Sequence, residues 1–149
     1  HYTAPVPGIL AMHEALRIIC EETLEERFFR HETSSLALQT GIETMGLELF
    51  VPQEYRLNSV VAIRIPDGVD GAKVRKTMAE RFHVEISGAF GLNIIRIGQM
   101  GEQCRSHNLF KTLYAMGMAF KKEGVRLNVS EGMAAMERRL SEHPHRYVT

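Results

Sequence analysis

The chain has 149 residues, 44% of them hydrophobic, which is enough for one ordinary core and too little for two comfortable domains. Eighteen Lys and Arg balance eighteen Asp and Glu, so no overall positive field favours binding to nucleic acid or to an anionic membrane. Cys20 and Cys104 form no C-x-x-C pair, which argues against zinc and disulfides, and the lack of a leader or long apolar run predicts a cytoplasmic location.

The N-terminal part of the sequence predicts a long helical stretch. Segment 1–5 starts without a methionine, as in a piece of a longer protein. From Pro5 to Gly46, hydrophobic residues recur at steps of three and four. The charged run 21–27 inside this stretch is interpreted as a solvated face rather than an acidic metal site, because metal ligands must converge and one exposed turn does not provide that. The hydrophobic stripe consists of Ile9, Met12, Leu16 and Ile19, then Ser35, Leu38, Ile42 and Met45.

Beyond Gly46 the hydrophobic period changes to two, which predicts strands. The predicted strands are 47–51, 59–65, 84–87 and 94–97.

Three further helices are predicted from their caps and hydrophobic faces. One is capped by Asp70, one runs from Ser106 or His107 to about Lys122, and one runs from Ser130 to about Leu140. The order of elements predicts an α+β fold, with helices covering one face of a small, mostly antiparallel sheet.

Arg96 is the most informative single residue, because it is a permanent cation in the otherwise hydrophobic run 94–98. An unpaired buried charge is costly, so a guanidinium here reaches solvent or meets an anion such as a carboxylate. Arg64 occupies a similar run, and the pattern alone does not say which arginine binds a ligand. Gly98 and Gly101 follow Arg96 and allow backbone and ligand to approach closely.

Other catalytic patterns are absent from the sequence. There is no H-E-x-x-H metal motif, no G-x-S-x-G elbow and no glycine-rich phosphate loop. A His31–Glu32 dyad is disfavoured, since adjacent residues on a helix point apart. The histidines are therefore interpreted as surface residues.

A series of segments, in the same order along nearly the whole chain, has a distinctive composition: 1–5, Glu14-Ala15-Leu16-Arg17, 22–27, Arg30-His31, 45–50 and Arg96-Ile97-Gly98-x-Met100-Gly101. Together they resemble the C-terminal small domain of class V, fold-type-I pyridoxal-phosphate aminotransferases. The similar branch contains the alanine-glyoxylate, serine-pyruvate and ureidoglycine-glyoxylate enzymes. The resemblance implies that residues 1–149 are this small domain, without the large cofactor-binding domain, and that 125–149 form a helical C-terminal extension of it.

The resemblance also implies roles for individual residues. In the family, the arginine that matches Arg96 clamps the substrate α-carboxylate, a task that suits a planar two-pronged donor. The threonine that matches Thr3 holds the cofactor phosphate of the neighbouring subunit, and Tyr2 stands where a histidine is usual, which makes both cofactor-binding candidates. Loop 88–93 is shorter than its family counterpart. The implied full-length enzyme is a homodimer that uses pyridoxal phosphate and small amino-acid and oxo-acid substrates.

We therefore expect the complete enzyme to transfer an amino group from a small donor to glyoxylate or a similar oxo acid. The chain alone is expected to bind no pyridoxal phosphate and to be inactive, because its lysines lie on predicted surface helices and none is a candidate for the Schiff base. Two other classes stay open: a stand-alone module that binds a carboxylate metabolite, and a protein-interaction domain whose first helix packs on a partner.

Overall fold

Alternating hydrophobic residues build the antiparallel sheet at the centre of the fold. In the computed structural model, which describes residues 4–142, the sheet consists of β1 (Val60–Arg64), β2 (Ser87–Ala89) and β3 (Leu92–Gly98), in the order β1-β3-β2. Both strand pairs are antiparallel. The predicted α+β class is confirmed.

The two longer strands bury one face of the sheet. Val61 and Ile63 of β1 lie in the core with Ile95 and Ile97 of β3, and β1 pairs with β3 so that Ala62 is opposite Arg96. Successive side chains of a strand point to opposite faces, so the residues between these core positions belong to the other face of the sheet.

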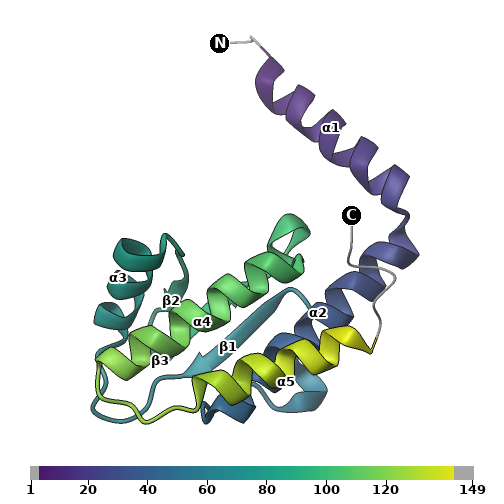
Figure 1. Cartoon of the computed structure of the whole chain (residues 1–149). Helices are drawn as coiled ribbons and strands as arrows, with labels where there is room; N and C mark the ends of the chain where they lie inside the picture. The colour runs from purple at the N-terminus through teal and green to yellow at the C-terminus, as the bar shows by residue number, and fades with distance from the viewer. Residues whose placement is uncertain (1–3, 143–149) are drawn as a thin grey trace.

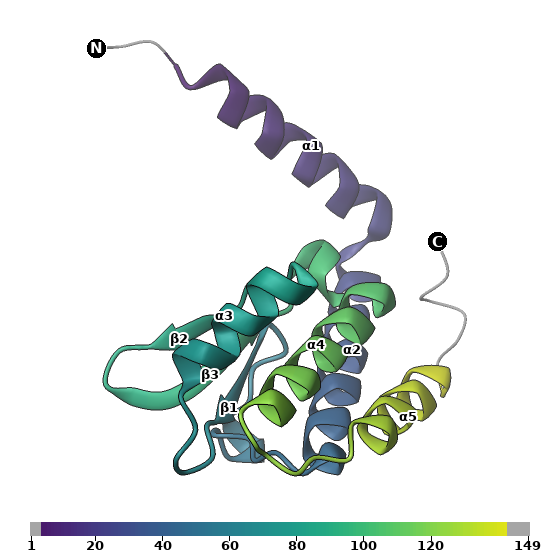
Figure 2. The same ribbon diagram turned by 60° about the vertical axis from the view of Figure 1, so that its left-hand side comes forward.

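Helices cover the core face. Figure 1 shows α4 (Ser106–Lys122) crossing in front of the sheet, and Figure 2 shows α3 (Gly71–Phe82) over β2 and β3, both of which α3 contacts. Beside them, α2 (Leu24–Met45) packs closely against α5 (Val129–Ser141). Short 3-10 turns cover Gln53–Tyr55 and Gly101–Cys104. The largest fully buried hydrophobic side chains are Phe120, Leu38, Ile42, Met45, Ile63, Met78, Ile95, Leu109, Leu113, Met116 and Met136.

The predicted N-terminal helical stretch is divided in two at Thr23, into α1 (Val6–Glu22) and α2. Thr23 has φ 69° and ψ 155°, a region that a β-branched residue rarely adopts and that costs of order 1–3 kcal/mol. Its hydroxyl accepts a hydrogen bond from the N–H of Glu26 at 3.4 Å and so caps α2. Thr23 and Glu26 match the S/T-x-x-E capping pattern, the local signal for this break.

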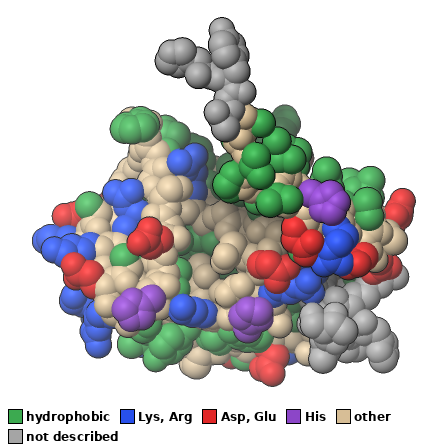
Figure 3. Space-filling model, turned by 90° about the horizontal axis from the view of Figure 1, so that it is seen from above, with side chains coloured by type: hydrophobic (Ala, Val, Ile, Leu, Met, Phe, Trp, Pro, Cys, Tyr) green, Lys and Arg blue, Asp and Glu red, His purple; other side chains and the backbone are tan. Residues whose placement is uncertain are grey.

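Helix α1 forms an arm that leaves the body of the domain at Thr23 (Figures 1 and 2). None of its residues is buried. In the view from above, hydrophobic side chains gather on the arm near its N-terminal end (Figure 3). The large exposed hydrophobic residues of α1 are Val6, Ile9, Leu10, Met12, Leu16 and Ile18. This long exposed face is unusual for an isolated soluble domain.

Two strand predictions are corrected. Segment 47–51 forms only one bridge, between Leu49 and Ile63, because Pro52 and the 3-10 turn end its pairing after a few residues. At 84–87 only Ser87 belongs to a strand. The N–H of Val84 instead donates to the carbonyl of Met78, since His83 ends α3 in the left-handed conformation.

Two glycines bring α2 and α5 into close contact. A Cβ at Gly132 of α5 would lie 2.6 Å from the carbonyl oxygen of Gly41, and one at Gly41 of α2 would lie 3.0 Å from the carbonyl oxygen of Gly132. Backbone atoms meet at this crossing, and a helix backbone does not move aside as a flexible side chain does.

We predict that Gly132→Ala lowers the free energy of unfolding by about 1–2 kcal/mol, because the clash outweighs the better helix propensity of alanine. The matched control is Gly8→Ala in α1, where the nearest atom would be 4.0 Å away. It should leave stability unchanged or raise it by about 0.5 kcal/mol. Denaturant titration measures both, and an equal effect of the two substitutions would contradict the tight crossing.

Candidate functional site

Arg96 lies on the face of the sheet opposite the core. Its neighbours Ile95 and Ile97 are buried in the core, so the alternation of β3 turns the Arg96 side chain the other way, and it is exposed. Its Nε donates a hydrogen bond to the carbonyl oxygen of Gly88 at 3.0 Å. Within residues 4–142, its two terminal nitrogens make no hydrogen bond or ion pair. The guanidinium is thus oriented by one bond and keeps the fork of donors that recognises a carboxylate.

Arg64 shares this face of the sheet but is already partnered. Its Nε lies 2.7 Å from a carboxylate oxygen of Glu48, and its guanidinium carbon lies 4.7 Å from the centre of the Phe50 ring. The ion pair and the cation–π contact satisfy its charge locally. The structure therefore separates two arginines that the sequence pattern leaves equivalent.

A cavity of about 360 Å³ lies between the first turns of α3 and the β2–β3 hairpin. Arg96 and Arg75 both line it, and none of its lining residues, all within 65–96, is acidic. Arg75 packs against Gly88, where a Cβ would lie only 2.7 Å from one of its terminal nitrogens. Two cations without a lining acid favour an anionic ligand, and the volume is within the range of small-molecule sites.

The other predicted site residues, Tyr2 and Thr3, lie outside the described residues 4–142. Their assignment to the cofactor stays a prediction. In the sequence they stand shortly before Val6, where α1 begins.

Comparison with known proteins places this fold in a family. The chain matches no protein-family model. It is 33% identical to the (S)-ureidoglycine--glyoxylate transaminase of Bacillus subtilis over 91% of its length, and 35% identical to the alanine--glyoxylate aminotransferase of Drosophila melanogaster over 88%. It covers only 33% and 35% of these two proteins, so it spans about a third of the length of these relatives.

Solved structures of aminotransferases also resemble this chain. The crystal structure of the Bacillus subtilis ureidoglycine-glyoxylate aminotransferase superimposes with a TM-score of 0.85 over 88% of this chain and 35% of its own, at 33% identity. That of the pyridoxamine-pyruvate aminotransferase from Mesorhizobium loti gives 0.90 over 95% of this chain and 37% of its own, at 28% identity. The chain belongs to the class V aminotransferase family.

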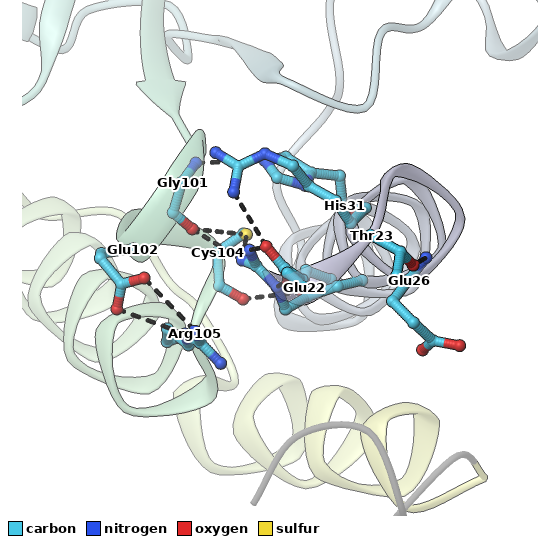
Figure 4. A network of polar contacts seen from close by, with 11 residues as sticks. Glu22, Thr23, Glu26, His31, Gly101, Glu102, Cys104 and Arg105 are labelled. Carbon is cyan, nitrogen blue, oxygen red and sulfur yellow. Dashed lines mark hydrogen bonds and ion pairs between the residues drawn. The ribbon is translucent and has the colours of Figure 1, made fainter. Parts of the chain in front are cut away.

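In this class V aminotransferase domain, a second polar cluster lies where α1 meets α2 (Figure 4). The Glu22 carboxylate, whose side chain is 17% exposed, accepts hydrogen bonds from Arg30 and from Arg27. Arg30 is 2% exposed, and its remaining nitrogen donates to the carbonyl oxygen of Gly101 at 2.7 Å and to Cys104 Sγ at 2.6 Å. We call these five residues the elbow cluster.

The elbow cluster corrects the interpretation of run 21–27 as a wholly solvated face. Glu22 points inward because Arg30, eight residues further along the chain on α2, offers a bidentate partner. These hydrogen bonds from Arg30 hold the pKa of Glu22 below its usual value. Burial raises the pKa of the Cys104 thiol, against the opposing charge of Arg30.

His31 has a structural partner at the same place. Its Nε2 accepts the N–H of Gly101 at 3.1 Å, and its Nδ1 lies 2.7 Å from the carbonyl oxygen of Arg27. A neutral ring with the proton on Nδ1 satisfies both contacts.

In residues 4–142, no three His, Cys, Asp or Glu side chains come together as a metal ion would require. A helix that crosses a bilayer needs a long apolar run. No helix in the part of the chain that the structure describes has such a run.

We predict an acid-sensitive contribution of Glu22 to stability. Its pKa is lowered in the folded state, so the contribution is present above its ordinary value of 4.5 and is lost as the pH falls through the lower folded value. The groups facing it are Arg30, Arg27 and, beyond Arg30, Cys104. Denaturant titrations of the chain and of Glu22→Gln between pH 7 and pH 3 should show a stability difference that shrinks with acid. A difference that is constant with pH would contradict the assignment.

Proposed function

We propose that the protein containing this chain is a pyridoxal-phosphate-dependent aminotransferase. It moves an amino group between a small amino donor and glyoxylate or a similar oxo acid, and Arg96 holds the substrate carboxylate. The observation that supports this assignment most is the pair of terminal nitrogens that Arg96 leaves without a partner within residues 4–142, at the edge of a cavity with no acidic lining. The relatives named for glyoxylate and pyruvate support the substrate class.

The described residues support binding and orientation of a substrate rather than covalent attachment of a cofactor. All five lysines of the chain lie exposed on α3 or α4, and none lines the cavity beside Arg96. Lys111, for example, bonds the carbonyl oxygen of His83, and Lys122 bonds the hydroxyl of Thr77. When bound, pyridoxal phosphate supplies the electron sink that amino-group transfer needs. We propose that the lysine that forms the Schiff base with this cofactor comes from the rest of the protein.

Arg96 performs its part by geometry. The bond to Gly88 fixes Nε, so that the two terminal nitrogens can receive both oxygens of a carboxylate in parallel. Gly88 lies on β2 and Arg96 lies on β3. Because these two strands pair in the sheet, they hold the Arg96 guanidinium in one orientation. A substrate held in this way presents its reacting carbon in a fixed place.

The exposed hydrophobic face of α1 supports the larger assembly. We propose that it packs against the remainder of a homodimeric enzyme, with Thr3 and Tyr2 reaching the cofactor phosphate of the neighbouring subunit. The share of the relatives that the chain covers, about a third, leaves ample protein for this contact.

We predict that Arg96→Lys in the full-length protein lowers kcat/KM for the oxo acid about tenfold to a hundredfold, because lysine offers no two-pronged contact. Arg64→Lys is the matched control on the same face, and its value should stay within about twofold. Steady-state assays with glyoxylate, against alanine, serine and ureidoglycine as donors, measure the effect and identify the donor. If Arg96→Lys has no effect, or if both variants lose equally, Arg96 does not clamp the substrate. Tight binding of oxo acids without turnover would favour a metabolite-binding module instead.

A further inference from the structure

The direction of α1 relative to the domain is decided at its C-terminal end. No residue of α1 is buried, and the helix projects away from the body (Figures 1 and 2). The chain turns at Thr23, directly after Glu22, in a backbone conformation that a threonine rarely adopts. Within residues 4–142 the main contact of α1 is with α2, so the contacts at its C-terminal end decide how firmly this turn is held.

Glu22 provides that restraint. It is the last residue of α1, and its two carboxylate oxygens are bound by Arg30 and Arg27, both on α2. Every side-chain nitrogen of Arg30 donates a hydrogen bond inside the elbow cluster, so the Glu22–Arg30 pair is satisfied although it is buried. Buried ion pairs add little net stability over hydrophobic packing, whereas their fixed geometry can specify one arrangement.

The same cluster holds the backbone that follows the arginine strand. Gly101 stands shortly after β3 ends at Gly98, and it binds α2 twice: its carbonyl oxygen accepts from Arg30, and its N–H donates to His31. Figure 4 shows Gly101, Cys104, Glu22 and His31 converging from three segments of the chain. The end of α1 and the segment that follows the strand carrying Arg96 are therefore both bound by one side chain of α2, Arg30.

We propose that Glu22 and Arg30 are positioning residues that set the direction of α1 relative to Arg96. This inference rests on the proposed function, in which the segment at the start of α1 holds the cofactor phosphate and Arg96 holds the substrate carboxylate. Groups that hold two reactants must be placed within about an ångström of their working positions. An arm as long as α1 turns a small change of angle at Glu22 into a large displacement at its far end.

The test uses the full-length protein with bound pyridoxal phosphate. Glu22→Gln removes the charge but keeps the shape, and Glu22→Asp keeps the charge but moves it by one methylene. The matched control is Arg17→Gln, which breaks an exposed ion-pair group with Glu14 and Glu21 on the same helix. For each variant, the cofactor dissociation constant by absorbance, KM for the oxo acid, kcat and the melting temperature are measured.

Both Glu22 variants should raise the cofactor dissociation constant at least tenfold, with a rise in KM, at temperatures where they are fully folded. Arg17→Gln should change neither by more than twofold. A lower melting temperature with unchanged cofactor and substrate constants would show a merely structural pair and overturn the inference. If Glu22→Gln does not fold, Glu22→Asp decides by the same criterion.

The outcome separates this inference from the proposed function. Loss of oxo-acid use in Arg96→Lys, together with normal constants in both Glu22 variants, removes only the positioning role. Normal oxo-acid use in Arg96→Lys removes the carboxylate clamp and the positioning role with it.

Discussion

Side-chain alternation in β3 is the constraint on which the rest of the structure depends. Ile95 and Ile97 complete the core, so Arg96 must face the other side of the sheet. A shift of register by one residue would bury the guanidinium and expose two isoleucines, which no core of this size tolerates. Burial of the hydrophobic face of the sheet thus places the Arg96 guanidinium on the other face. Its hydrogen bond to the carbonyl oxygen of Gly88 then orients it.

Two other features of the molecule lie outside its core. The hairpin and α3 form a cavity with two arginines beside it, and α1 projects from the body as a hydrophobic arm. Neither feature helps an isolated domain, since unpaired cations repel and exposed hydrophobic residues favour association. Both features suit a domain that completes a site together with other protein, which agrees with the coverage of about a third of its aminotransferase relatives.

Periodicity predicted much of this fold, because β1, β3, α3, α4 and α5 each bury a regular stripe. It did not predict the elbow cluster, since Arg30 and Gly101 are 71 residues apart and their contact depends on packing. The break at Thr23 had a local signal, the capping pattern with Glu26, which the strong hydrophobic stripe of the same region masked. Arg96 was found by its unusual place in a hydrophobic run, but its distinction from Arg64 required the contacts of Arg64 with Glu48 and Phe50.

The proposed role of Arg96 is to receive a substrate carboxylate. A crystal structure of the full-length protein with a bound oxo acid or amino acid tests it most directly. We expect two parallel hydrogen bonds of about 2.7–2.9 Å between the terminal nitrogens of Arg96 and the carboxylate oxygens. A carboxylate held elsewhere, with the Arg96 guanidinium facing solvent, would contradict it.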